Sequence, residues 1–329
     1  MVKEYTKKLS IIVPIYNAEE YIEDCVKSLL KQDLSEQEYE IILINDGSKD
    51  NSLKLAQKLK EQNSNIVLLS QENKGQSVAR NKGMDIAKGK YIMFVDADDK
   101  LYPNVIKKIV SVGEEHLLDV CAYRIKYYDS EGKEIEGAIQ PFATDKIYKG
   151  SFAVMNGADI GAVWLNLYSN SFINTHELRF LEGIYHEDVD FNLRMYAFAD
   201  RMMFTDIVGY SYNYNPNSST REQSKAKYIK SIKDDIFVVK HIREFSTEQN
   251  IKTELKDFYL RHGNSMLVSK LLMMLKSKYI SSNEKKEIFN MMKSYNLYPI
   301  KGGTLSRKSS FLIQILNIEW LYKLLISKT

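Results

Sequence analysis

The chain has 329 residues, of which 44% are hydrophobic and 27% charged, and a formal net charge of +3. This length suits one large α/β domain with a smaller appendage, and the composition is that of a soluble globular protein. A positive charge this small does not predict a protein that binds nucleic acid. The sequence contains no apolar run of the roughly 18–20 residues that a membrane span needs.

Two further observations predict a cytoplasmic protein. Residues 1–10 contain lysines but lack the apolar core of a signal peptide. The two cysteines, Cys25 and Cys121, lie in apolar surroundings, which is typical of buried thiols in a reducing compartment.

The first half of the sequence alternates strand and helix patterns. Short apolar runs rich in β-branched residues predict strands at residues 9–15, 39–45, 66–69 and 90–95. Apolar residues at helical spacing predict helices between them, at residues 18–32, 52–62 and 76–87. This alternation predicts right-handed βαβ units and a mainly parallel sheet with helices on both faces.

The pattern changes after about residue 117. Residues 118–128 are typical of a strand followed by a turn, which predicts a hairpin, and residues 202–212 are typical of a last strand. Residues 150–161 are expected to contain a short helix, and helical spacing predicts helices at residues 186–199, 229–245, 253–275, 284–295 and 306–328. Because the polar stretch 213–224 follows the last strand, we expect an α/β domain at residues 1–215 and a helical region at residues 216–329.

Three carboxylates, Asp96, Asp98 and Asp99, follow the strand predicted at residues 90–95. In open α/β sheets this is the edge where ligands bind. Side chains two residues apart in extended backbone point the same way, and two like charges held close together favour a cation between them. Carboxylate oxygens suit Mg²⁺ or Mn²⁺, whose shell a diphosphate can complete. The alternative is that these acids are turn or cap residues, and we keep that interpretation for Asp99.

Polar or turn residues also follow the other three strands. They are Pro14 and Tyr16, then Asp46, then Asn73 and Gly75. Because parallel strands present their carboxyl ends at one edge, we expect these residues to converge with the acids. Asp46 can accept a hydrogen bond from a base or ribose, Tyr16 offers an aromatic face, and Gly75 permits close backbone approach. Arg80 can place a planar cation near a phosphate or base, and its alternative is an ordinary helical salt bridge.

A second acidic group, His186-Glu187-Asp188, begins a predicted helix. The positive end of the helix favours ionised carboxylates, which is the state that a general base requires. The alternative is that both acids only stabilise the helix. We expect His186 to cap the helix or support the neighbouring acids. Arg194 lies four residues after Asp190, a spacing that predicts a surface pair.

Trp164 and Tyr168 are candidate platforms for an acceptor sugar, because aromatic faces stack on the C–H surfaces of sugars. The alternative is that both are buried between the sheet and the helix that follows residue 186.

The last predicted helix, residues 306–328, is amphipathic and carries basic residues at both ends. One interpretation is an anchor on a membrane surface, which would suit a lipid-linked acceptor and place the protein at the inner face of the cell membrane. The other is a helix that packs on the α/β domain or on a second subunit of a homo-oligomer.

Five motifs occur in order along the chain. They are Val13-Pro14-Ile15-Tyr16-Asn17, Asn45-Asp46-Gly47-Ser48, Asn73-Lys74-Gly75 with Ala79-Arg80-Asn81-Lys82-Gly83, Asp96-Ala97-Asp98-Asp99, and Glu187-Asp188 with Phe191 and Arg194. This set resembles glycosyltransferase family 2, a large group of inverting GT-A enzymes that use nucleotide sugars. The motifs span residues 9–200 and do not cover the chain after about residue 215.

The resemblance implies a Rossmann-like GT-A sheet with a mostly α-helical C-terminal extension. It implies transfer of a sugar from a nucleotide diphosphate sugar, with uridine as the expected base, to a hydroxyl of a glycan, glycolipid or glycoprotein. Bacterial surface polysaccharide or glycoprotein glycan synthesis is the setting expected of the family. Mn²⁺ or Mg²⁺ is the implied cofactor.

The resemblance also implies roles for residues. Pro14, Tyr16 and Asp46 are expected to line the nucleoside pocket, with Gly75 and Arg80 completing the nucleotide-sugar site. Asp96 is expected to meet the ribose or the metal, and Asp98 to bind the metal held by the diphosphate. The expected catalytic base is Asp188, with Glu187 as the alternative, and Trp164 and Arg194 are the acceptor-side candidates.

Two other functions compete with this one. A sugar-phosphate nucleotidyltransferase would carry a glycine-rich loop after its first strand, whereas residues 14–18 contain no glycine. The sequence also lacks the glycine spacings of dinucleotide-binding and phosphate-binding loops. A non-catalytic GT-A partner subunit is the other alternative, and the presence of Asp96, Asp98, Glu187 and Asp188 argues against it.

Overall fold

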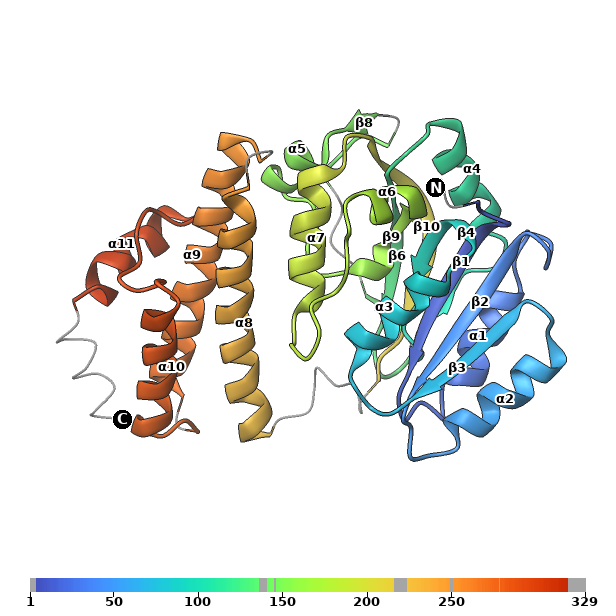
Figure 1. The fold of residues 1–329 in the computed structure, drawn as a ribbon, viewed down its shortest axis with the longest axis horizontal. Coiled ribbons are helices and arrows are strands. Elements are labelled where there is room, and N and C mark those ends of the chain that lie inside the picture. Colours follow the sequence, from blue (N-terminus) through green and yellow to red (C-terminus); the bar gives the residue numbers. More distant parts are fainter. Residues whose placement is uncertain are drawn as a thin grey trace. The chain divides into compact units, whose positions relative to one another are not determined.

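The computed structural model describes residues 4–135, 141–144, 146–215, 224–248, 251–277 and 279–318. The chain divides into two compact units (Figure 1). The first comprises Met1–Gly183 and Phe198–Ser218, and the second comprises Ile184–Ala197 and Ser219–Thr329. Helix α7 (Glu187–Phe198) therefore belongs almost entirely to the second unit, although it precedes the last strand in the sequence.

The first unit is built on one mixed sheet. Its strands are β1 (Lys7–Ile15), β2 (Tyr39–Asp46), β3 (Ile66–Gln71), β4 (Gly89–Phe94), β5 (Lys100–Leu101), β6 (Val120–Tyr128), β7 (Glu134–Ile135), β8 (Ile147–Tyr148), β9 (Asn166–Ser169) and β10 (Met202–Tyr212). Within the described part of the chain their order is β3-β2-β1-β4-β9-β6-β10-β5, with β7 beside β6 and β8 beside β10. The β3-β2-β1-β4 half is parallel, as is the pair of β6 and β10, whereas β9 is antiparallel to both β4 and β6.

Helices of the first unit alternate with its strands. They are α1 (Ile22–Leu30), α2 (Ser52–Gln62), α3 (Gln76–Ile86), α4 (Ile106–Glu115), α5 (Gly150–Met155), the 3₁₀ turn η1 (Val163–Leu165) and α6 (Asn170–Thr175). Strand β1 is buried on both faces because its side chains alternate in direction. Ile11 packs in the same core as Cys25 of α1 and Ala56 of α2, whereas Ile12 meets Gly83 of α3. Helices therefore cover both faces of the parallel half, as the alternating pattern predicts.

The second unit is helical. Besides α7 it contains α8 (Lys225–Ser246), α9 (Thr253–Lys276), α10 (Ser282–Ser294) and α11 (Arg307–Leu316). The apolar sides of the last four helices form a core of their own, which includes Ile236, Leu267, Ile288 and Ile313. Across the residues that the structure describes, no helix combines the length and the apolar character that crossing a membrane requires.

Most of the predicted elements are confirmed. Strands β1–β4 and helices α2 and α3 lie where the pattern places them, α1 is shorter than predicted, and the predicted hairpin is β6 with β7. The short strands β5, β8 and β9 have no counterpart in the prediction, because so few residues carry no periodic pattern. Of the amphipathic segment 306–328, the structure describes α11 and the residues up to 318, and the remainder lies outside the described residues.

Gly83 sets how closely α3 approaches β1. A Cβ atom at this position would lie 2.5 Å from Cγ2 of the fully buried Ile12. We predict that Gly83→Ala lowers the thermal unfolding midpoint, because overpacking of this kind costs about 1–3 kcal/mol. The gain in helix propensity of about 1 kcal/mol offsets only part of this strain.

The matched control is Gly161→Ala. A Cβ atom at this position would lie 3.7 Å from Asp159 Oδ1, which is an ordinary van der Waals distance. Calorimetry of both variants checks the prediction. A Gly83→Ala protein as stable as the control would show that α3 and β1 can separate without loss of packing.

Candidate active site

The acidic turn after β4 is held in shape by its third acid. Asp99 is buried, its Oδ2 accepts a hydrogen bond from the Tyr210 hydroxyl at 2.8 Å, and its Oδ1 accepts one from the Asn213 N–H at 2.9 Å. Burial, together with the negative charges of Asp96 and Asp98, raises the pKa of Asp99 to about 8. Asp99 therefore ties the end of β10 to this turn, which agrees with the structural interpretation that we kept for it.

Asp96 forms an ion pair with a buried cation on α3. Arg80 Nη2 lies 2.8 Å from Asp96 Oδ1, and the Arg80 side chain is 4% exposed. The guanidinium also lies over the Phe180 ring, 5.4 Å from its centroid. Arg80 is thus no ordinary surface salt-bridge residue, because it joins the first turns of α3 to the end of β4.

Asp98 is half-buried beside residues that follow β10. Its Oδ2 accepts a hydrogen bond of 2.7 Å from the Asn215 side chain, and Asn215 Oδ1 in turn accepts one from the Tyr21 hydroxyl at 3.1 Å. Asn213 and Asn215 belong to the stretch that we interpreted only as a domain boundary. Sequence reasoning missed their contact with the acids, which are more than a hundred residues away in the chain.

Asp46 shapes the loop between β3 and α3. Its Oδ1 accepts hydrogen bonds from the Gln71 side chain and the Lys74 N–H, and its Oδ2 accepts one from the Gly75 N–H, each at 2.8 Å. Gly75 has a φ of 91°, which favours glycine, although a Cβ there would meet no atom within 4 Å. The backbone conformation, not space, therefore requires this glycine.

The loops after β1 and β2 are joined in the same way. The Asn17 N–H donates to Ser48 Oγ at 3.1 Å, and Asn17 Oδ1 accepts from the Lys49 N–H at 2.8 Å. Pro14 is half-buried in β1, and the Tyr16 ring beyond the strand is 47% exposed. The ends of β1, β2, β3 and β4 are thus linked by polar contacts into one set of loops, as their parallel order predicts.

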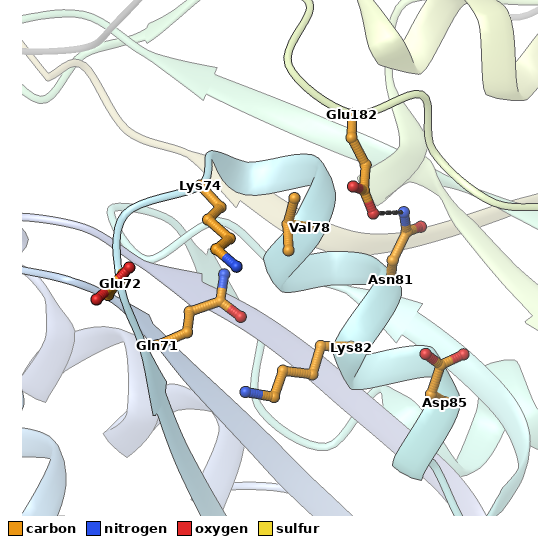
Figure 2. A pocket seen from close by; sticks show the side chains of 8 residues that line it. All are labelled: Gln71, Glu72, Lys74, Val78, Asn81, Lys82, Asp85 and Glu182. Atoms are coloured by element: carbon orange, nitrogen blue, oxygen red, sulfur yellow. Dashed lines mark hydrogen bonds between the residues drawn. The ribbon is translucent and has the colours of Figure 1, made fainter.

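A cavity of about 390 Å³ lies beside α3 and the loop before it. Its lining side chains are largely polar and include Gln71, Lys74, Asn81, Lys82 and Glu182 (Figure 2). Asn81 Nδ2 donates a hydrogen bond to Glu182 Oε1 at 3.2 Å. The cavity shares Gln71 and Lys74 with the loop that Asp46 shapes, but Asp96 and Asp98 do not line it.

Glu187 and Asp188 form the first turn of α7, in the second unit. Glu187 is buried, whereas Asp188 is half-buried and its Oδ1 accepts a hydrogen bond from the Val189 N–H at 2.8 Å. A general base must reach the proton that it removes, so the greater exposure of Asp188 favours it over Glu187. Its role as base stays a prediction.

Two interpretations need correction, the exposed platform at Tyr168 and the surface location of the pair of Arg194 and Asp190. Tyr168 is fully buried and its hydroxyl donates to the Val163 carbonyl at 3.0 Å, so it is no exposed platform. The pair of Arg194 and Asp190 exists, but it is buried, with Nε and Nη2 of Arg194 lying 2.9 and 2.6 Å from Asp190 Oδ2. The acceptor role of Arg194 stays a prediction. Trp164 is half-buried and stacks on Tyr210 at 4.8 Å, and its acceptor role stays a prediction.

The acidic turn offers few carboxylates, which suits a divalent cation whose shell is completed by phosphate and water. The described residues contain no cluster of three or more His, Cys, Asp or Glu side chains that could hold a metal ion. Mg²⁺ and similar ions at nucleotide sites take only one or two protein carboxylates and complete their shell with phosphate and water. Asp98 supplies such oxygens, and Asp96 lies beside it with its charge offset by Arg80.

Loops joined at the carboxyl ends of parallel strands, with carboxylates at the same edge, are typical of α/β proteins that bind a ligand at this edge. The family described as glycosyl transferase family 2 matches residues 10–176, about half of the chain. The chain therefore belongs to glycosyl transferase family 2.

Individual relatives agree with this assignment. The uncharacterized glycosyltransferase YibD of Escherichia coli (strain K12) is 34% identical over 227 residues, which are 66% of this chain and 64% of YibD. The crystal structure of S. aureus TarS 1–349 in complex with UDP-GlcNAc has a TM-score of 0.74 at 20% identity and covers 97% of this chain and 90% of that one. This likeness shows that the fold is GT-A.

A more distant structure shares the fold. It is the mannosyltransferase PcManGT from Pyrobaculum calidifontis in complex with GDP-Man and Mn²⁺, with a TM-score of 0.54 at 12% identity. The match covers 95% of this chain and 88% of that one.

The residue before α7 gives a pH-dependent contribution to stability. The pKa of His186 lies above its ordinary value because Asp235 binds the protonated ring, although burial opposes this. The ion pair therefore stabilises the folded protein below about pH 6.5, the ordinary pKa of histidine, and this stabilisation is lost as the pH rises through the raised pKa. We predict that His186→Asn lowers the thermal midpoint more at about pH 6 than at about pH 9.

The control for this comparison is His116→Asn, which changes an exposed histidine of the first unit. Equal losses for His186→Asn at the two pH values would contradict the prediction.

Proposed function

We propose that the protein is an inverting glycosyltransferase that moves a sugar from a UDP-sugar to a hydroxyl of a glycan, glycolipid or glycoprotein acceptor. The linked strand-end loops around Asp46, Asp96 and Asp98 carry this proposal, because they form the edge where a nucleotide binds in such sheets. The complexes of TarS with UDP and UDP-GlcNAc support a UDP-sugar as donor. Family membership favours this function over a nucleotidyltransferase or a non-catalytic subunit.

In this proposal the nucleotide-sugar site belongs to residues 1–215. The exposed Tyr16 ring lies at the end of β1, where a base can stack on it. Asp46 and Gly75 shape the loop that approaches the nucleoside. Asp96 accepts a hydrogen bond from a ribose hydroxyl, and Arg80 holds the Asp96 carboxylate in place. The helical region at residues 216–329 is proposed to serve packing, oligomerisation or contact with a membrane surface.

Mn²⁺ or Mg²⁺, when bound, would be held by Asp98 with Asp96 beside it, and would offset the negative charge that grows on the departing diphosphate. The complex of PcManGT with GDP-Man and Mn²⁺ is consistent with this proposal.

The chemistry is one in-line displacement at the anomeric carbon. The acceptor oxygen forms a bond to this carbon while the bond to the diphosphate oxygen breaks, and the nucleoside diphosphate leaves with the bonding electrons. Asp188 takes the acceptor proton. The transition state has oxocarbenium character, as in glycoside hydrolysis, and no covalent enzyme intermediate forms.

Incubation with a panel of UDP- and GDP-sugars and Mn²⁺ tests the function, with nucleotide release as the readout. We expect UDP release from at least one UDP-sugar, faster when an acceptor glycan is added. Release of no nucleotide from any donor would contradict the proposal, and release of pyrophosphate from a nucleoside triphosphate and a sugar phosphate would show a nucleotidyltransferase.

Helix α11 is a candidate for contact with a membrane surface. Phe311 and Ile315 are exposed, while Ile313 and Leu316 pack in the core of the second unit. Arg307 and Lys308 at the start of the helix add positive charge. These features favour contact with a membrane surface that carries a lipid-linked acceptor.

For the base, we predict that Asp188→Asn lowers kcat by about 10²–10⁴-fold, the usual worth of general-base help, while donor affinity stays near that of the wild type. Glu187→Gln is the matched variant, one residue away, and is expected to retain more activity. Steady-state kinetics and calorimetric UDP binding measure both effects. Full turnover by Asp188→Asn would exclude this residue as the base.

For the metal, we predict that Asp98→Ala weakens UDP binding in Mn²⁺ by about 10-fold or more, because a charged contact is worth about 1.5–3 kcal/mol. With EDTA present, the variant and the wild type should bind UDP alike. Asp24→Ala, which removes an exposed partner of Lys100, is the control. Unchanged affinity of Asp98→Ala in Mn²⁺ would remove Asp98 from the metal site.

A further inference from the structure

Helix α7 is fastened to α8 immediately before its first turn. The Tyr185 N–H donates a hydrogen bond to Asp234 Oδ2 at 2.9 Å. His186 Nδ1 lies 2.8 Å from Asp235 Oδ1, in an ion pair when the ring is protonated. Two adjacent acids of α8 thus hold the two residues that lead into Glu187 and Asp188. All these residues belong to the second unit.

The Asp235 carboxylate contacts two basic side chains, His186 and Lys270. Its side chain is 4% exposed, and its second oxygen lies 2.6 Å from Nζ of Lys270 on α9. A buried carboxylate needs such partners, because an uncompensated buried charge is strongly destabilising. The acid is therefore fixed from two sides, by α9 through Lys270 and by the α7 entry through His186.

His186 has a left-handed backbone conformation. Its φ is +62°, in the region that only a few per cent of non-glycine residues adopt, with asparagine, aspartate and histidine enriched there. Such conformations persist where the surroundings determine them, and they are common at functional sites. The pair with Asp235 is a surrounding contact that fixes His186, and the backbone direction at this residue sets where the next residues point.

The rest of α7 is anchored separately. His241 Nδ1 of α8 lies 2.5 Å from Asp190 Oδ1, which is fully buried. Farther along, the buried Tyr259 hydroxyl of α9 donates to the Leu193 carbonyl at 2.6 Å. Loss of the Asp235 contact therefore loosens the helix entry at His186, while the Tyr185–Asp234 hydrogen bond and the contacts of the helix body remain.

We propose that Asp235, acting through His186, is a positioning residue for the general base carried by the first turn of α7. The inference rests on the proposed transferase function. Asp235 touches neither reactant; it holds the backbone that aims Asp188. A displacement of about 1 Å at a reacting group can lower the rate by 10²-fold, so a small change at the helix entry has a large effect on kcat.

The test compares Asp235→Asn with Asp257→Asn, the same change at an exposed partner of Arg261 on α9. We expect Asp235→Asn to lower kcat by about 10- to 100-fold with the KM for the donor unchanged, because the nucleotide-sugar site is built by the first unit. Asp235→Glu keeps the charge and is expected to restore part of the rate. Asp257→Asn is expected to behave as the wild type.

His186→Asn tests the same contact without leaving a buried charge alone, since Lys270 still pairs with Asp235. Asparagine also tolerates the left-handed backbone. We expect the same selective loss of kcat, and a double variant no slower than the more affected single variant, because both changes break one contact. If Asp235→Asn does not fold, His186→Asn alone tests the positioning role.

The outcomes separate the two proposals. A wild-type protein that releases no nucleotide from any donor overturns the transferase function and this inference with it. An active wild type with unchanged kcat in folded Asp235→Asn or in His186→Asn overturns the positioning role alone. Equal losses of kcat in Asp235→Asn and Asp257→Asn also overturn it, because they would show a general loss of stability.

Discussion

The ion pair of Arg80 and Asp96 is the interaction on which the candidate nucleotide site depends. Arg80 is almost fully buried, so it needs a negative partner, and Asp96 at the end of β4 is that partner. The pair fixes α3 against the carboxyl end of a strand, beside Asp98 in the same acidic turn. Through α3 the pair also connects the acidic turn to the loop that Asp46 shapes.

The candidate residues divide between the two compact units. The first unit builds the nucleotide side from strand ends, using hydrogen bonds between loops. The second unit contains the acids of α7, and α8 supplies ionisable partners to that helix and its entry, while Tyr259 of α9 donates a hydrogen bond to its backbone. The C-terminal helices are therefore not an appendage to α7, because they supply the groups that hold it.

Much of the first unit could be predicted from the sequence because its information is local. Short apolar runs rich in β-branched residues mark β1–β4, and parallel order then places Asp46 and Asp96 at one edge. Tyr168 could not be placed, since β9 has four residues and carries no periodic signal. Its burial follows from pairing with both β4 and β6.

The contacts that hold the acidic turn and the entry to α7 could not be predicted, because their partners are far apart in the chain. Asn215 binds Asp98, and Asp235 binds His186, yet neither pair leaves a spacing or motif that marks it. The same is true of Arg194, whose spacing from Asp190 predicts the pair but not its burial. Burial depends on packing of α7 against other helices, which a local pattern does not encode.

A crystal structure of the protein with UDP and Mn²⁺ tests the central claim most directly. The account predicts that the uracil lies against Tyr16 and Asp46, the ribose at Asp96 and the diphosphate with its metal at Asp98. UDP bound elsewhere, for example in the cavity lined by Lys82 and Glu182 with Asp96 and Asp98 untouched, would contradict it.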